Sequence, residues 1–249
     1  MKNEANEALE RYLGKELNDV YFLGSSKGAK LFYELLYDGQ RISRDAPDMV
    51  CLNGATALII EHFEFDCYRA GKKGSKNKQE QARISKQGES LEIPEDGLVY
   101  TDTIHGKSSY EDYIKNLTVN FNSHYKKIEA YKQNLLNDGL ITPETNIKVS
   151  FLIEDVSPLP CTYKERMNES MKMKPIELAH SPEFLALFEN SPELDYVLSC
   201  STTSDGHKVW FIDRNEISFY KNEVVNYKNK EFIAHDAKVT RVSYIIKKD

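Results

Sequence analysis

Acidic side chains gather in one short stretch of the chain, with a spacing that is suited to chemistry. Asp48 opens one apolar run, and the next run carries Glu61, His62, Glu64 and Asp66. Carboxylates within apolar runs are unfavourable to bury unless a protein donor or a cation pairs with them. Carboxylate oxygens select Mg²⁺ or Mn²⁺, and such a cation can bind a phosphate and activate water. The stretch therefore predicts a divalent-metal site with hydrolytic chemistry.

A β-hairpin is expected to position these acids. Asp48–Leu52 is a short apolar run after a proline, Asn53–Gly54 is a turn dipeptide, and Ala57–Phe65 is rich in β-branched and aromatic residues. Because the partners of a hairpin lie side by side, the carboxylates of Asp48 and Glu61 should lie about 4–6 Å apart. At that distance they can share one cation.

The motif Pro47-Asp48, followed after twelve residues by Glu61-His62-Phe63, resembles the PD-(D/E)xK nuclease superfamily. Members of that superfamily have an Asp at a strand start and an acid-x-Lys triplet on the partner strand. Phe63 stands where the family has its lysine, so one of the three signature side chains is absent here. The resemblance implies a metal-dependent nuclease that hydrolyses phosphodiester bonds of DNA or RNA with Mg²⁺ or Mn²⁺.

The resemblance also assigns site residues. Asp48 and Glu61 become metal ligands and catalytic residues. Strand alternation places His62, Glu64 and Asp66 on the opposite face from Glu61, so both sets cannot line one site. We therefore keep His62 as an alternate catalytic residue and Asp66 as an alternate ligand. An acid from the preceding helix often joins the metal site in the family, which makes Glu34 a further candidate ligand.

A basic segment leaves the end of the acid-bearing strand. It contains no acid and these basic residues: Arg69, Lys72, Lys73, Lys76 and Lys78. Its side chains are expected to neutralise phosphates beside the metal, and Lys73 is the candidate to replace the lysine missing at position 63. The alternative is a solvated loop, the usual role of a charged run.

Apolar periodicity and breaker residues predict the rest of the core. The expected elements are a helix at 27–37, the hairpin, a helix at 109–137, a strand at 147–153, a helix at 182–190 and a strand at 194–200. A long helix followed by a buried strand is a crossover, which implies parallel pairing in a helix-covered sheet. This predicts an α/β fold, a mixed α+β sheet flanked by helices, with the restriction-endonuclease-like element order of the superfamily.

The chain is predicted to divide near residue 200. Residues 1–200 would form the nuclease-like core with an N-terminal helix. Residues 201–249 would form a C-terminal β-meander packed on the same domain, with strands at 209–212, 217–220, 224–227 and 239–246.

Composition limits the partners. A net charge of −6 argues against a purely electrostatic nucleic-acid binder, although a local basic patch can coexist with an acidic site. No apolar run approaches the roughly 20 residues that cross a bilayer, so we expect a cytoplasmic protein with no membrane partner. The four cysteines show no CxxC pair and are expected to be buried thiols in a reducing compartment. The helix at 109–137 offers a surface for a homodimer.

Two other functions remain open. The missing lysine favours a catalytically inactive, nuclease-fold binding or regulatory module. Alternatively, His62 and Asp66 could serve a different metal-dependent hydrolase, joined by His105 or Asp102 in a mixed nitrogen and oxygen site. A nucleic-acid partner is expected if the nuclease assignment is right.

Overall fold

The structure is a computed structural model that describes residues 4–14, 17, 20–68, 70–71, 74–75, 98–106, 109–157, 161–167, 170–203, 206–232 and 237–245. Its centre is a six-stranded mixed sheet. The strands are, in order across the sheet, β1 (Gln40–Ser43), β2 (Met49–Asn53), β3 (Thr56–Phe65), β7 (Asn146–Asp155), β10 (Tyr196–Thr203) and β11 (Gly206–Asp213). Pairing is parallel between β3, β7 and β10 and antiparallel at both edges.

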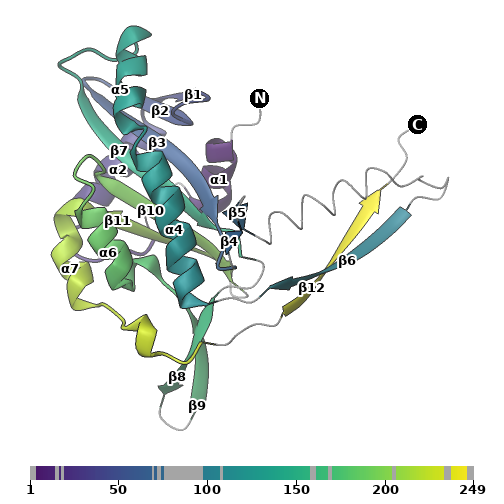
Figure 1. Ribbon diagram of the computed structural model, residues 1–249. Coiled ribbons are helices and arrows are strands. Elements are labelled where there is room, and N and C mark those ends of the chain that lie inside the picture. The colour runs from purple at the N-terminus through teal and green to yellow at the C-terminus, as the bar shows by residue number, and fades with distance from the viewer. Residues whose placement is uncertain are drawn as a thin grey trace.

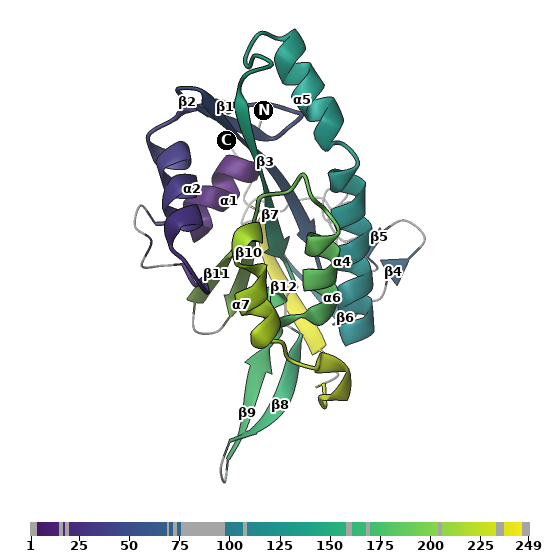
Figure 2. The ribbon, with the colours of Figure 1, turned by 90° about the vertical axis from the view of Figure 1, so that its left-hand side faces the viewer.

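Helices cover both faces of the sheet (Figures 1 and 2). On one face lie α1 (Glu4–Tyr12) and α2 (Lys27–Tyr37); on the other lie α4 (Tyr110–Tyr125), α5 (Ile128–Asn137), α6 (Pro182–Glu189) and α7 (Ile217–Asn222). Each face has its own apolar core, because the side chains of β3 alternate between them. Ile59 and Phe63 join the core under α4, whereas Leu58 and Ile60 join the core under α2. The predicted mixed α+β sheet flanked by helices is confirmed.

The predicted hairpin is confirmed as β2 and β3. Met49 pairs with Ile60, and Asn53 pairs with Thr56 across the turn. Gly54 has a φ of 57°, the left-handed conformation that this turn type requires and that glycine adopts without a side-chain clash. The predicted parallel crossover is also confirmed, since β7 pairs in parallel with β3 and with β10.

The expected helix at 109–137 is two helices. Ser109 caps α4 by accepting a hydrogen bond from the Asp112 amide, as its position predicts. The helix ends at Tyr125, where the Lys127 amide bonds to the His124 carbonyl in the tighter three-residue spacing. Helix α5 then continues toward the hairpin end of the sheet. A homodimer through this region stays a prediction.

The expected C-terminal β-meander is only partly correct: the strand expected at 209–212 is present, whereas 217–220 and 224–227 form no strands. The division at residue 200 falls within β10, and β11 completes the main sheet. Residues 217–220 lie in α7, because helical spacing lets Ile217 and Tyr220 pack inward together while Phe219 stays 51% exposed. The expected strand at 224–227 is replaced by a turn leading to the 3₁₀ helix η4 (Tyr227–Asn229).

Three two-stranded ribbons complete the described structure. They are β4 (Ala70–Gly71) with β5 (Gly74–Ser75), β6 (Leu98–Gly106) with β12 (Ala237–Ile245), and β8 (Thr162–Met167) with β9 (Ser170–Pro175). The strand expected at 239–246 is thus present as β12, paired outside the main sheet. Two further 3₁₀ helices are η2 (Leu178–His180) and η3 (Arg214–Glu216). Figure 2 shows β8 and β9 extending from the end of the molecule.

Two expectations from composition can be compared with the structure. All four cysteines are free and buried, as predicted. Among the described residues, no helix combines the length and the apolar character needed to cross a bilayer.

Candidate functional site

Strand β3 carries polar side chains toward both faces of the sheet. Glu61 points to the α4 and α5 side, and His62 points to the α1 side; both residues are buried. The alternation of a strand therefore creates two candidate centres that share one backbone segment.

The first centre is built around Glu61. Its Oε1 accepts a hydrogen bond from the Tyr131 hydroxyl of α5 and lies 2.6 Å from Nδ1 of His124 on α4. The His124 ring stacks on Phe63, with the ring centroids 4.9 Å apart. Phe63, at the position of the family's lysine, is only 4% exposed and also packs against Phe151. This position therefore belongs to the core.

Asp48 adjoins this centre at the start of β2. Its Oδ2 accepts a hydrogen bond from the His62 amide at 2.7 Å. Burial, together with the charge of Glu61, raises the pKa of Asp48 to about 6, against the lowering effect of the hydrogen bond from the His62 amide. Asp48 and Glu61 thus interact electrostatically, and the predicted separation of about 4–6 Å between their carboxylates stays a prediction. The nitrogen beside Glu61 comes from His124, a residue of helix α4.

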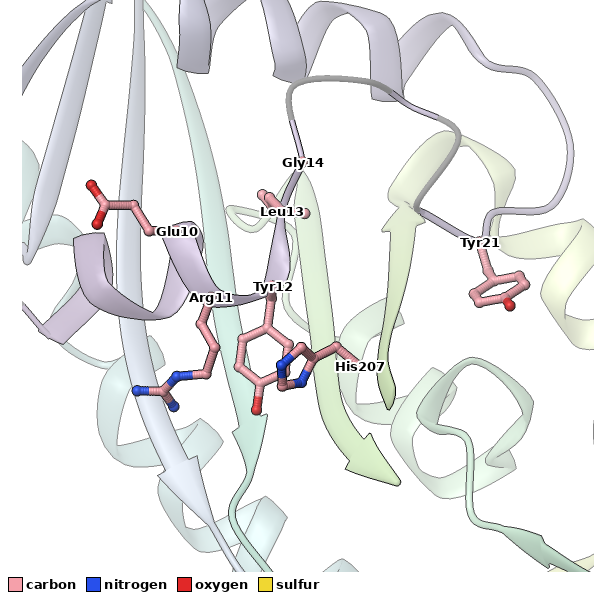
Figure 3. A pocket seen from close by; sticks show the side chains of 7 residues that line it. All are labelled: Glu10, Arg11, Tyr12, Leu13, Gly14, Tyr21 and His207. Atoms are coloured by element: carbon pink, nitrogen blue, oxygen red, sulfur yellow. The ribbon is translucent and has the colours of Figure 1, made fainter. Parts of the chain in front are cut away.

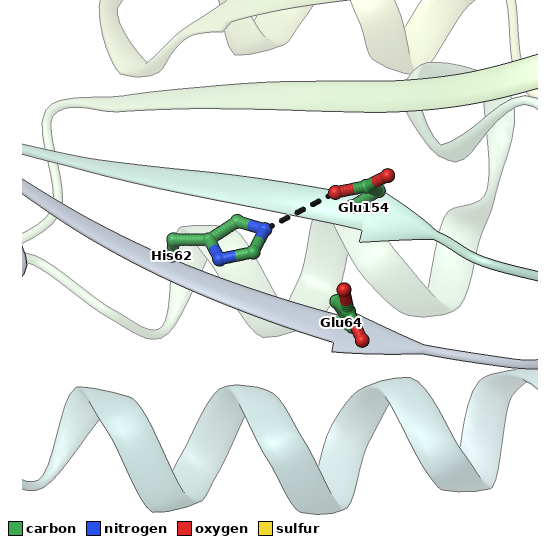
Figure 4. A group of neighbouring side chains, drawn as sticks. All are labelled: His62, Glu64 and Glu154. Atoms are coloured by element: carbon green, nitrogen blue, oxygen red, sulfur yellow. Dashed lines mark hydrogen bonds and ion pairs between the residues drawn. The ribbon is translucent and has the colours of Figure 1, made fainter. Parts of the chain in front are cut away.

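The second centre lies on the opposite face, where β3 and β7 run in parallel. His62 Nε2 lies 3.3 Å from Oε2 of Glu154 (Figure 4). Glu64 is the register partner of Glu154, so the two side chains are neighbours across the strands. His62, Glu64 and Glu154 each offer one ligand atom, and these atoms lie within 4.8 Å of one another. Within the part of the chain that the structure describes, Asp48 and Glu61 belong to no such group.

Glu154 is held in place from helix α1. Its Oε1 accepts hydrogen bonds from the Arg11 guanidinium at 2.6 Å and from the Tyr12 hydroxyl at 2.9 Å. Burial alone would raise the pKa of Glu154. The hydrogen bonds from His62 and Tyr12 and the positive charge of Arg11 outweigh burial and lower this pKa below its ordinary value. Glu154 is therefore a carboxylate at neutral pH, the form that binds metal.

One pair of atoms in this second centre has the separation of two ligands of one divalent cation. Two ligand atoms that are each about 2.1 Å from a metal lie about 3.0–3.4 Å apart when the angle between the two metal–ligand bonds is about 90–110°. The 3.3 Å between His62 and Glu154 falls in this range. One imidazole and two carboxylates suit Mn²⁺ or Zn²⁺ better than Mg²⁺, which prefers oxygen ligands.

In the ranges of the chain that the structure describes, the other candidate ligands are not members of the group formed by His62, Glu64 and Glu154. Glu34 is exposed on α2, across the sheet from Glu61. Asp66 is buried, and its Oδ1 accepts a hydrogen bond from the Tyr68 amide. Asp102 and His105 belong to β6, in the ribbon with β12. The predicted nucleic-acid-binding residues Arg69, Lys72, Lys73, Lys76 and Lys78 lie outside the described residues.

Sequence reasoning missed most of the partners that surround the two centres. Glu154 follows a buried apolar run, and the predicted parallel pairing of that run pointed to the hairpin without giving its register. His124 and Tyr131 recur within an amphipathic helical pattern, in which nothing distinguishes them from core or surface residues. Arg11 and Tyr12 end the N-terminal helix, and no local signal connects them with Glu154.

Comparison of the chain with family models, with curated proteins and with solved structures found no match.

Proposed function

We propose that this chain is a divalent-metal-dependent hydrolase that cleaves phosphodiester bonds of DNA or RNA, with the metal held by His62, Glu64 and Glu154. The observation that carries the proposal is the approach of one imidazole nitrogen and two carboxylates to within 4.8 Å of one another. A bound Mn²⁺ would bind the scissile phosphate and lower the pKa of a water molecule.

Nucleic acid as the substrate rests on different support. Pro47-Asp48 and Glu61 resemble the nuclease pattern. The order α2, β1 to β3, α4 and β7, with β4 to β6 and α5 in between, resembles the element order of that superfamily. Likeness of element order is an analogy and carries no chemistry by itself. The proposed metal site therefore lies on the opposite face of β3 from Glu61, which the motif pairs with Asp48.

Arg11 gives this face a second feature that hydrolysis needs. One nitrogen of its guanidinium holds Glu154, and 47% of the side chain is exposed. Its remaining N–H groups are available to a phosphate, because a guanidinium has five donors in a fixed plane. A fixed positive charge beside the ligands stabilises the negative charge that develops on a phosphate in the transition state.

A binding or regulatory module without activity is the second candidate. It is favoured by the core position of Phe63 and by the two protein groups, His124 and Tyr131, that already satisfy Glu61.

For either candidate we propose a cytoplasmic location, because four buried free thiols suit a reducing compartment.

Cleavage of supercoiled plasmid, single-stranded DNA and RNA in Mn²⁺ and in EDTA tests the proposal. Wild type should cleave at least one of them only with Mn²⁺. Glu64→Gln and Glu154→Gln should lose about 100-fold in rate, because each removes a charged ligand. Glu129→Gln is the matched control, since Glu129 is exposed on α5 and pairs with Lys132.

Two results would contradict the proposal. A wild type with no Mn²⁺-dependent cleavage would favour the binding module. Loss of cleavage in Glu61→Gln, with full cleavage in Glu64→Gln, would return the metal to the Asp48 and Glu61 pair. Circular dichroism of each variant shows whether the fold is retained.

A further inference from the structure

A pocket opens beside the second centre, between the end of α1 and the start of β11. Its volume is about 470 Å³, and the side chains that line it are Glu10, Arg11, Tyr12, Leu13, Gly14, Tyr21 and His207 (Figure 3). A pocket of roughly 300–1,000 Å³ accommodates a small ligand or one unit of a larger one.

A chain of polar contacts connects this pocket with the His62 group. The Tyr12 hydroxyl donates to Glu154 and lies 3.2 Å from Oγ1 of Thr202. Thr202 Oγ1 in turn lies 3.0 Å from Nδ1 of His207, whose ring packs edge-on against Tyr12. Arg11 and Tyr12 therefore belong both to the pocket wall and to the support of Glu154. A ligand in the pocket lies next to the proposed metal ligands.

Arg11 is the group in the pocket lining that can meet an anion, and one of its nitrogens also pairs with Glu154. Arg11 stays cationic, since its pKa is raised by the charge of Glu154. Glu10 is the acid of the lining, and its carboxylate accepts a hydrogen bond from Asn6. Figure 3 shows this carboxylate directed away from Arg11 and His207. The exposed part of the Arg11 guanidinium is thus open to a phosphate.

The far side of the pocket is aromatic. Tyr21 is 55% exposed, and its ring lies 5.5 Å from that of Trp210 on β11. Backbone hydrogen bonds fix this tyrosine, because its amide donates to the Val209 carbonyl and its carbonyl accepts from the Phe211 amide. A fixed and exposed aromatic ring is a platform on which an unpaired base can stack.

We infer that this pocket binds one nucleotide of a single-stranded nucleic acid, with a phosphate on Arg11 and the base on Tyr21. The inference deepens the proposed function and rests on it for the adjoining reaction, but binding itself needs no metal. Stacking on a side chain requires a base that is not paired, which excludes an intact duplex at this position. The strand then continues from Arg11 toward His62, Glu64 and Glu154.

Fluorescence anisotropy in EDTA tests this inference separately from catalysis. The probe is a labelled oligothymidylate about 12 nucleotides long. Tyr21→Ala should weaken binding about tenfold, because a stacked base contributes about 1–3 kcal/mol. Arg11→Gln should also weaken binding and should reduce the slope of log affinity against log salt by about one. Phe219→Ala is the matched control, because Phe219 is similarly exposed but does not line the pocket.

Three results would overturn the inference. Tyr21→Ala could bind the probe as tightly as wild type does. A duplex of the same sequence could compete as well as the unlabelled single strand, or thymidine monophosphate could compete as well as the oligonucleotide. Failure of Mn²⁺-dependent cleavage alone would leave binding in EDTA unchanged, so the two proposals can fail independently.

Discussion

Strand β3 carries one glutamate on each face, Glu61 and Glu64, and the two have different surroundings. Glu61 meets a histidine and a tyrosine from two helices, which satisfy its carboxylate with protein donors. Three positions along the strand, Glu64 lies near the carboxylate of Glu154 on the neighbouring strand β7 and near the imidazole of His62 on β3 itself. The first arrangement stabilises a helix–sheet contact, and the second gathers negative charge that a cation would stabilise. The residues that surround a glutamate, and not the residue type, therefore decide whether it makes a structural contact or is a candidate metal ligand.

The largest expected effect comes from removing the carboxylate of the first centre. Glu61→Ala leaves the Tyr131 hydroxyl and the His124 ring without their acceptor, so the free energy of unfolding should fall by about 3 kcal/mol. Urea unfolding measures this change. Glu64→Ala should lower the free energy of unfolding by less than about 1 kcal/mol in EDTA. Equal losses in the two variants would remove the distinction between the faces.

A smaller loss is expected from the hydroxyl that supports Glu154. Tyr12→Phe removes one hydrogen bond to a charged group and one contact with Thr202, so the free energy of unfolding should fall by about 1–2 kcal/mol. Tyr21→Phe, which removes the hydroxyl of an exposed tyrosine, should change it by less than about 0.5 kcal/mol. Similar values for both variants would show that Tyr12 does not hold Glu154.

The smallest effect concerns the dependence of stability on pH. Burial raises the pKa of Asp48 from 3.8 to about 6, so the folded protein takes up this proton at a higher pH than the unfolded chain does. The contribution of protonated Asp48 to stability is complete below about pH 4 and is lost as pH rises through about 6. Asp48→Asn should therefore flatten the change in unfolding free energy between about pH 4 and 7. Identical slopes in the two proteins, measured in EDTA, would contradict the raised pKa.

The sequence predicted the elements whose signals are local. The Asn53–Gly54 turn, the Ser109 cap and the apolar runs that form β3 and β7 all depend on neighbouring residues, and each was found where expected. The strand predicted at 217–220 was wrong because a short apolar segment fits a helix and a strand equally well. Their packing on the sheet selects the helix.

The candidate site was predictable only in part for the same physical reason. The predicted hairpin pairs the strand that follows Asp48 with the strand that carries Glu61, because both strands belong to one local unit. The partners that separate the two centres are more distant: Glu154 is 92 residues from His62, and Tyr131 is 70 residues from Glu61. Register between distant strands and the rotation of a helix are set by packing, which the pattern of a single sequence does not specify.

Titration calorimetry with Mn²⁺ tests the central claim most directly, namely that the cation binds on the His62 face. Wild type should bind one Mn²⁺ per chain, Glu61→Gln should retain that binding, and Glu64→Gln should weaken it by about tenfold or more. The contradicting result is the reverse pattern, in which Glu61→Gln loses Mn²⁺ while Glu64→Gln binds it as wild type does.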